Sequence, residues 1–395
     1  MMAGITKIDM AKTGNEAMAY AMKQINPDVV AAYPITPATE IVQIFAQYVA
    51  DGEVDTEYVP VESEHSAMSA CIGSSAAGAR TMTGTSSQGL ALMYEMCYIA
   101  AGLRLPIVMS DVNRALSAPI NIHCDHSDTM GMRDAGWIHI FSENPQEAYD
   151  NMLQAVRIAE HEKVRLPVLV TTDGFIISHG MERVATLPDD EVTKFIGPFQ
   201  PGTKLLDVAR PITVGALNFT DFYFEHRRAL VDAQAAAVPV IKAVGREFGQ
   251  KYGTAYDCIE PYQLADAEYA IVALGSTCGT AKVVIDQLRA TGVKAGMLKV
   301  RVFRPFPASE IAAALRGKKA VAVLDRSDVL GGFGGPVFTE VRSALYQQAG
   351  APVLADYIYG LGGREIDMEM IGSVFAQLQD GTAKPDSVQY LGVRD

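Results

Sequence analysis

The chain has 395 residues, of which 49% are apolar and 20% charged, and its formal net charge is −13. These values predict two or three globular domains and argue against a nucleic-acid-binding protein, which would carry a basic face. The sequence contains neither an apolar run of roughly 20 residues, as a membrane span needs, nor a signal-peptide core, so we expect a cytoplasmic protein without a membrane span.

The first half of the chain alternates short apolar runs with helical patterns. Strands are predicted at residues 28–33, 58–61, 80–83, 106–111, 137–141 and 167–171, and helices at 40–50, 64–77, 89–102 and 145–160. Buried strands that alternate with helices predict a mostly parallel, doubly wound α/β sheet.

The stretch 185–211 is weakly periodic and rich in Gly and Pro, which predicts a linker, and a long helix is expected at 220–252. The alternation then resumes, with strands at 270–274, 296–300, 320–324 and 353–357 and helices at 280–290, 308–316, 336–349 and 364–378. We therefore expect an α/β domain over 1–195, a linker and long helix over 196–260, and a smaller α/β domain over 261–395.

Polar turns follow several strands of the first domain, at the edge where open parallel sheets bind ligands. The turn Pro34-Ile35-Thr36 places a hydroxyl at its apex, which could touch a ligand or cap the next helix. Glu64 begins a predicted helix, where it could either serve as a helix-start charge or contact a buried heterocycle.

The turn after the third predicted strand is Thr85-Ser86-Ser87-Gln88. Hydroxyl groups at a helix start suit a phosphate or a close backbone approach. The turn lacks the lysine of a P-loop, so the sequence does not support nucleotide hydrolysis.

Arg114 follows the fourth predicted strand, where it could grip a carboxylate or form a surface salt bridge. The polar loop 121–128 contains two histidines whose spacing is not a zinc pattern, and the five cysteines of the chain are scattered. We therefore predict reduced thiols, no metal site and no iron–sulfur cluster in this chain, and we interpret the loop as the wall of a site.

Taken in order, several segments resemble the alpha subunit of 2-oxoacid:ferredoxin oxidoreductases of the pyruvate synthase type. They are YPITP, VESEHSAMSACIGSSAAGARTMTGTSSQGLALM, RLPIVMSDVNRALSAPINIHCDHSD, RDAGWI, IVALGS and LDRSDVLGGFGGP. The resemblance implies a thiamine-diphosphate-binding domain of the pyrimidine type followed by a transketolase C-terminal-like domain. It also implies oxidative decarboxylation of a 2-oxoacid with coenzyme A to acyl-CoA and CO2, with reduction of ferredoxin, or the reverse reaction.

The same resemblance implies partner subunits. Thiamine diphosphate would be shared with a beta subunit that binds its diphosphate and Mg²⁺, and [4Fe-4S] clusters would lie on partners. Small gamma and ferredoxin-like delta subunits are expected, with ferredoxin or flavodoxin as the electron acceptor. The absence of a G-D-G motif with a downstream asparagine from this chain fits that division.

Site residues are carried over position by position. Glu64 matches the glutamate that bonds the aminopyrimidine ring, and Thr36 and Arg114 match residues that hold the substrate carboxylate. A neutral Thr36 favours a monocarboxylic acid, with pyruvate first and branched-chain or aryl 2-oxoacids as alternatives. Contacts with the coenzyme are expected from Pro34, Ile35, Thr85, Ser86, Ser87 and Gln88. A contact with the substrate is expected from Asn121, and Asp128 is a further candidate for the site.

Three other classes of function compete with this assignment. The chain could be a non-catalytic scaffold subunit of a thiamine-dependent complex, although Glu64, Thr36 and Arg114 argue against this. It could also belong to a thiamine-dependent carboligase or decarboxylase that uses no ferredoxin. An NAD-dependent dehydrogenase is disfavoured, because no G-x-G-x-x-G motif follows the first predicted strand.

Overall fold

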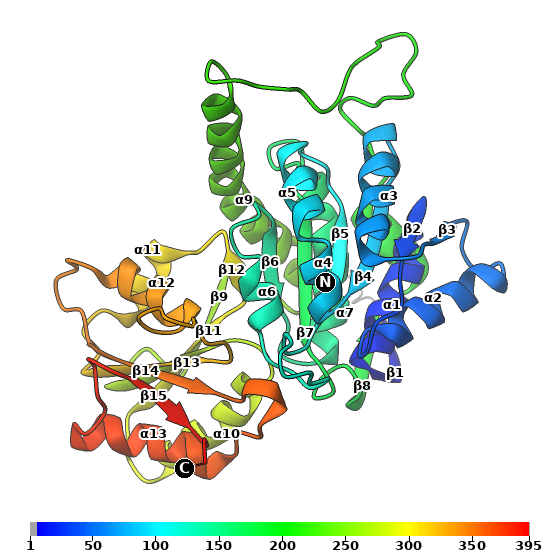
Figure 1. The fold of residues 1–395 in the computed structure, drawn as a ribbon. Helices are drawn as coiled ribbons and strands as arrows, with labels where there is room; N and C mark the ends of the chain where they lie inside the picture. The colour runs from blue at the N-terminus through cyan, green and yellow to red at the C-terminus, as the bar shows by residue number, and fades with distance from the viewer. Residues whose placement is uncertain (1–5, 395) are drawn as a thin grey trace.

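The computed structural model describes residues 6–394 and has two α/β lobes, each built around a twisted sheet (Figure 1). The first sheet has seven strands in the order β12-β6-β7-β5-β4-β2-β3. All neighbouring strands are parallel except β12 and β6, which confirms the predicted doubly wound fold. The strands are β2 (Val29–Ala32), β3 (Glu57–Pro60), β4 (Thr81–Thr85), β5 (Val108–Asn113), β6 (Ile138–Phe141), β7 (Val168–Asp173) and β12 (Val302–Arg304).

The helices of the first lobe include two whose predicted bounds match those observed, α3 and α7. At α7, Asn144 caps the helix by accepting from the amide of Glu147, with proline in the first turn. The helix predicted at 89–102 is instead two helices that meet at Met93, and Leu90, Met93 and Cys97 all enter one core. The helices are α1 (Gly14–Ile25), α2 (Thr39–Ala50), α3 (Glu64–Ala77), α4 (Ser87–Leu92), α5 (Tyr94–Gly102), α6 (Ser127–Gly131), α7 (Pro145–Glu160) and α8 (Asp189–Ile196).

The second sheet has six strands in the order β15-β14-β13-β10-β11-β9, and only β9 is antiparallel to its neighbour. The four strands predicted here are all present. The strands are β9 (Ile259–Tyr262), β10 (Tyr269–Ala273), β11 (Ala295–Val300), β13 (Ala320–Asp325), β14 (Val353–Tyr359) and β15 (Val388–Leu391), and the helices are α10 (Thr277–Ala290), α11 (Ala308–Leu315), α12 (Pro336–Leu345), α13 (Met368–Asp380) and the short 3-10 helix η1 (Leu361–Gly363).

The predicted linker at 185–211 is wrong in its first part. Strand β8 (Met181–Thr186) pairs with β1 (Ile8–Thr13), and α8 then packs Phe195 against Phe248 of the long helix α9 (Tyr223–Tyr252). These elements form because their apolar faces are buried by tertiary contacts that a weak local pattern does not reveal. The limits drawn at 195 and 261 stay a prediction, and β12, from beyond 261, completes the edge of the first sheet.

Residues 198–222 contain no helix or strand and form an extended arm that leaves the body of the first lobe (Figure 1). The arm is attached near the C-terminal end of α3, where the amide of Leu205 donates to the carbonyl of Ala76 (2.9 Å). Many of its large apolar side chains are exposed: Leu205, Leu206, Val208, Ile212, Val214, Leu217 and Phe219. Across residues 6–394, no helix combines the length and the apolar character that a bilayer crossing requires.

Candidate active site

The candidate site lies at the carboxyl ends of the central strands of the first sheet. Strand β2 has β3 on one side and β4 on the other, so the loops that follow β2 and β4 diverge there. Such a point, where the connections of a parallel sheet change direction, leaves a crevice in which ligands bind. Glu64, the first residue of α3, is carried to the same edge by the loop after β3.

Glu64 contacts the turn after β4. Its side chain is 7% exposed, and Ser63 caps α3 in front of it by accepting from the amide of Ser66. A Cβ atom added to Gly89 would lie 2.8 Å from Glu64 Oε1 and 2.5 Å from Thr85 Oγ1. The carboxyl of Glu64 and the hydroxyl of Thr85 therefore meet over a position that only glycine leaves open.

Two buried hydroxyl groups in this turn have no hydrogen-bond partner among the described residues. They are Thr85 Oγ1 and Ser86 Oγ, both fully buried. Buried polar atoms are normally paired, so unpaired ones beside a carboxyl group are typical of a ligand site. A carboxyl group and two unpaired hydroxyl groups are the donors and acceptors that suit the polar edge of an aminopyrimidine ring. Ser87 and Gln88 follow, and Ser87 Oγ is instead used to bond the carbonyl of Ala115 (2.7 Å).

Arg114 lies at the end of β5, 7% exposed, and is held by two backbone carbonyl groups. Its Nε donates to Asn121 O (3.0 Å) and its Nη1 to Thr36 O (3.0 Å). The structure thus brings together the three residues predicted to face the substrate, with Pro34 and Ile35 just before Thr36. Within residues 6–394, Nη2 of Arg114 and Oγ1 of Thr36 have no bonded partner, so both can serve a ligand.

The side chain of Asn121 has a different environment from the one expected. Its Nδ2 donates to Gly362 O of the second lobe (2.8 Å), and its Oδ1 accepts from the amide of His123 (2.8 Å). Only the backbone carbonyl group of Asn121 contacts Arg114. The contact of Asn121 with substrate therefore stays a prediction, and its observed bonds tie the loop 121–128 to the second lobe.

Two buried acids lie next to these residues, Asp128, which was a candidate from the sequence, and Asp111, which sequence reasoning missed. Asp128 accepts from the amides of Ser87 (3.0 Å) and Arg114 (2.9 Å), and Asn113 bridges it to Asp111. Burial raises the pKa of Asp128 to about 6, and burial with the Asp128 charge raises that of Asp111 well above its usual value. The available signal was the polar pair Asp111 and Asn113 in a fully buried central strand.

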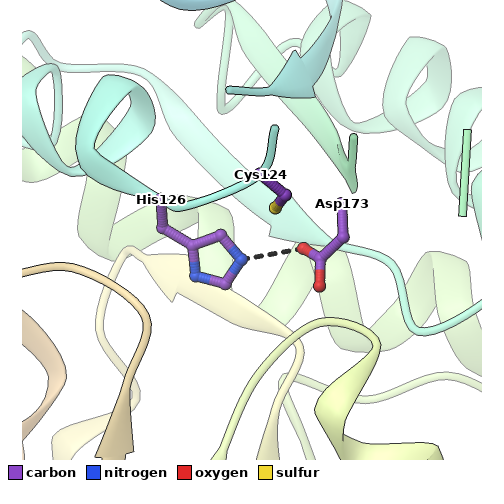
Figure 2. Close-up of side chains that lie close together, drawn as sticks. All are labelled: Cys124, His126 and Asp173. Atoms are coloured by element: carbon purple, nitrogen blue, oxygen red, sulfur yellow. Dashed lines mark hydrogen bonds and ion pairs between the residues drawn. The ribbon is translucent and has the colours of Figure 1, made fainter. Parts of the chain in front are cut away.

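The loop 121–128 also meets the second lobe through a buried polar cluster. Figure 2 shows His126 pointing its ring at Asp173, with the Cys124 sulfur beside them, and the His126 Nε2 to Asp173 Oδ1 distance is 2.8 Å. Asp173 Oδ2 accepts from Arg326 Nη1 (2.8 Å) and from Ser276 of the second lobe. Burial alone would raise the pKa of Asp173, but His126 and Arg326 outweigh it and hold that pKa below its ordinary value. A guanidinium group already supplies the positive charge that a metal ion would bring.

Comparisons with known proteins agree with this geometry. A family model described as "Pyruvate flavodoxin/ferredoxin oxidoreductase, thiamine diP-bdg" matches residues 20–246. A second, "Pyruvate:ferredoxin oxidoreductase core domain II", matches residues 267–371. Fold and crevice define a two-lobed α/β protein of the thiamine diphosphate-binding class. The chain belongs to the pyruvate flavodoxin/ferredoxin oxidoreductase family, which confirms the resemblance seen in the sequence.

Curated relatives match along nearly the whole chain. The pyruvate synthase subunit PorA of Thermotoga maritima is 55% identical and covers 98% of both chains. The subunit of that name from Methanocaldococcus jannaschii is 46% identical, with 97% of both chains covered. The ketoisovalerate oxidoreductase subunit VorA of Pyrococcus abyssi is 46% identical over 92% of this chain and 91% of its own.

Two solved structures share the fold at low sequence identity. A 2-oxoglutarate:ferredoxin oxidoreductase from Magnetococcus marinus, with 2-oxoglutarate, coenzyme A and succinyl-CoA bound, has a TM-score of 0.73 at 23% identity; the match covers 95% of this chain and 65% of that one. A split gene transketolase, an inactive beta4 tetramer, has a TM-score of 0.55 at 15% identity, covering 97% and 100%.

Proposed function

We propose that this chain is the alpha subunit of a multisubunit 2-oxoacid:ferredoxin oxidoreductase that works on pyruvate in the cytoplasm. The reaction is decarboxylation of the 2-oxoacid with coenzyme A to acyl-CoA and CO2, coupled to reduction of ferredoxin or flavodoxin, or its reverse. The observation that carries this proposal is Glu64, a buried carboxyl group next to unpaired hydroxyls, in a family that binds thiamine diphosphate.

In this proposal the Glu64 carboxyl group bonds the aminopyrimidine ring. Bound there, thiamine diphosphate would supply an acidic carbon that serves, without its proton, as the nucleophile toward a 2-oxoacid. By bonding a ring nitrogen, the Glu64 carboxyl group would favour the imino form of the ring, whose exocyclic nitrogen can accept a proton. Thr85 Oγ1 and Ser86 Oγ are the nearby groups that can bond and orient the ring.

Arg114 and Thr36 are proposed to bind the carboxylate of the substrate. Two carbonyl groups fix the guanidinium plane and leave Nη2 free, so that a carboxylate can bond it without rearrangement. Position 36 holds a neutral threonine and not a second positive side chain beside Arg114. This supports a substrate with a single carboxylate. Pyruvate is favoured by the relative at 55% identity, and the ketoisovalerate relative keeps branched-chain acids as the alternative.

Partner subunits are part of the proposal. A beta subunit would bind the diphosphate and Mg²⁺, the [4Fe-4S] clusters would lie on partner subunits, and small gamma and ferredoxin-like delta subunits would complete the complex. The relatives named as subunits support this, as do the exposed apolar side chains of the arm 198–222, which would be unfavourable in water on a monomer.

The test is Glu64→Ala in the complete, co-purified complex. We expect turnover to fall by ~10²–10⁴-fold, the usual contribution of a positioned acid–base group, with subunit composition unchanged. Glu62→Ala, at an exposed neighbouring carboxylate, is the matched control and should keep activity. Unchanged turnover in Glu64→Ala would favour the scaffold hypothesis instead.

A panel of 2-oxoacids tests the substrate. Coenzyme-A-dependent viologen reduction should be fastest with pyruvate. If only bulky acids reacted, the substrate assignment would be wrong while the reaction type stood. Activity without an external acceptor, in a complex lacking iron–sulfur absorbance, would point to a carboligase or decarboxylase.

A further inference from the structure

Asp128 is a buried carboxylate at the start of α6 that joins two separate parts of the crevice. It is 3% exposed. Its Oδ2 atom accepts from the amide of Ser87 (3.0 Å) and from the amide of Arg114 (2.9 Å). Its Oδ1 atom accepts from Asn113 Nδ2 (2.9 Å) and from the amide of Thr129 (2.8 Å). All four bonds run to nitrogen donors, so both oxygens act only as acceptors.

The two amides bound by Oδ2 belong to opposite sides of the crevice. Ser87 starts α4, the helix whose Gly89 contacts Glu64, and it takes a positive φ of 51°, which costs a residue other than glycine some strain. Arg114 directly follows β5 and carries the guanidinium group proposed to bind the substrate. One oxygen atom thus sets the spacing between the coenzyme side and the substrate side.

Burial of the Asp128 carboxylate is energetically unfavourable. No Lys, Arg or His side chain within residues 6–394 forms a salt bridge with it, and the neighbouring Asp111 is a second buried acid. Burying a carboxylate without a counter-charge costs free energy that an apolar residue would not. Only a hydrogen-bond acceptor at this position can bond the amides of both Ser87 and Arg114.

We propose that Asp128 is a positioning residue, which holds the Arg114 backbone and the turn from Thr85 to Gln88 at the spacing that 2-oxoacid binding requires. The proposal rests on the function proposed above and adds to it a residue that touches neither coenzyme nor substrate.

The test is Asp128→Asn in the complete complex, assayed with pyruvate. An amide of nearly the same shape must turn its NH2 group toward either the Ser87 and Arg114 amides or Asn113 and Thr129, so donors would face donors. Loss of such bonds costs ~1–3 kcal/mol, or about 5- to 150-fold in binding. We expect KM for pyruvate to rise about 10-fold or more, with turnover at saturation changed less.

A double-mutant cycle separates positioning from general destabilisation. If Asp128 acts through Arg114, Asp128→Asn should raise KM much less in an Arg114→Lys background than in the wild type. Equal effects in both backgrounds would overturn the proposal. Should Asp128→Asn not fold, Asp128→Ser, which lacks the donor conflict, is expected to raise KM in the same direction.

Asp150→Asn is the matched control. Asp150 is also a fully buried acid of the first lobe, with a pKa raised by burial to about 6, but it bonds Tyr256 and Gln146 behind the sheet. It should lower thermal stability and leave KM unchanged. If both variants changed only stability, Asp128 would be structural. A complex that fails to reduce viologen with every 2-oxoacid tested would instead overturn the proposed function. The two failures are therefore distinguishable.

Discussion

Gly89 and Gly335 occupy similar places in the two lobes, at the start of a helix that follows a central parallel strand. A Cβ at Gly89 would lie 2.5 Å from Thr85 Oγ1 and 2.8 Å from Glu64 Oε1. A Cβ at Gly335 would lie 2.3 Å from Asp325 Oδ2. In the first lobe the atoms around the glycine include unpaired ones, whereas Asp325 already accepts from the amides of Val337 and Phe338 (2.9 Å each).

This difference explains why the strand ends of the first lobe can form a ligand site, whereas those of the second lobe have a structural role. The N-terminus of α12 is filled by the carboxyl group of Asp325 in the same lobe, so an added anion has no free amides there. The residues that follow strands of the second lobe bond the first lobe instead. Arg326 pairs with Asp173, and the carbonyl of Gly362 accepts from Asn121. Fold alone does not make a site; polar groups left without partners do.

Gly89→Ala should give the largest effect on activity. The added methyl group must displace Glu64 or Thr85, and a misplaced acid–base group loses its contribution, so turnover should fall by about 100-fold or more. Gly372→Ala in α13, where the space around the glycine is open, is the control. Full activity in Gly89→Ala would mean that the space over this glycine is not used.

Arg114→Lys should affect substrate binding next. A lysine cannot keep both carbonyl bonds and also bond a carboxylate in bidentate fashion. The loss of ~1.5–3 kcal/mol corresponds to a rise in KM for pyruvate of about 10- to 100-fold, with a smaller change in turnover at saturation. Steady-state kinetics of the complex measure this, and Arg183→Lys, at an exposed arginine on β8, should match the wild type.

Gly335→Ala should change stability and not chemistry. Because the new atom would also lie 2.6 Å from Asp325 Cβ, the clash cannot be relieved by rotating a side-chain tip. Overpacking of this kind costs ~1–3 kcal/mol. The midpoint of thermal unfolding should fall by several degrees, while KM and turnover of the folded complex stay the same. A rise in KM equal to that of Gly89→Ala would contradict the contrast between the lobes.

The smallest effect concerns pH. Burial, with the Asp356 carboxyl nearby, raises the pKa of Asp325 to about 8. The native state therefore binds this proton more tightly than the unfolded chain, so its stability is greatest below the unfolded pKa of roughly 4 and declines as pH rises through about 8. Asp325→Asn should flatten that decline in thermal midpoints between about pH 5 and 9. Identical slopes in variant and wild type would contradict this pKa.

The sequence predicted the elements with strong local signals. Buried Val- and Ile-rich strands, and α7 with its Asn144 cap and Pro145, were placed well because periodicity and capping are local properties. The pairing of β1 with β8 and the helix α8 were missed. Their stability comes from distant partners, such as Phe195 on Phe248, which a window of sequence cannot contain.

The site was foreseen in part. Arg114 and Thr36, far apart in the chain, are in contact because the carboxyl ends of β2 and β5 share one sheet edge, and their binding of substrate stays a prediction. The engagement of Asn121 with Gly362 was not foreseeable, since it depends on how the second lobe sits against the first. The acceptor role of Asp128 depends likewise on backbone amides, which carry no mark in the sequence.

The central claim is that Glu64 controls the proton on the coenzyme. It is tested most directly by the rate at which the reactive carbon of bound thiamine diphosphate exchanges its proton for deuterium, in the complete complex and at equal coenzyme saturation. We expect Glu64→Gln to slow this exchange by about 100-fold or more relative to the wild type. Equal exchange rates in the two complexes would contradict the account.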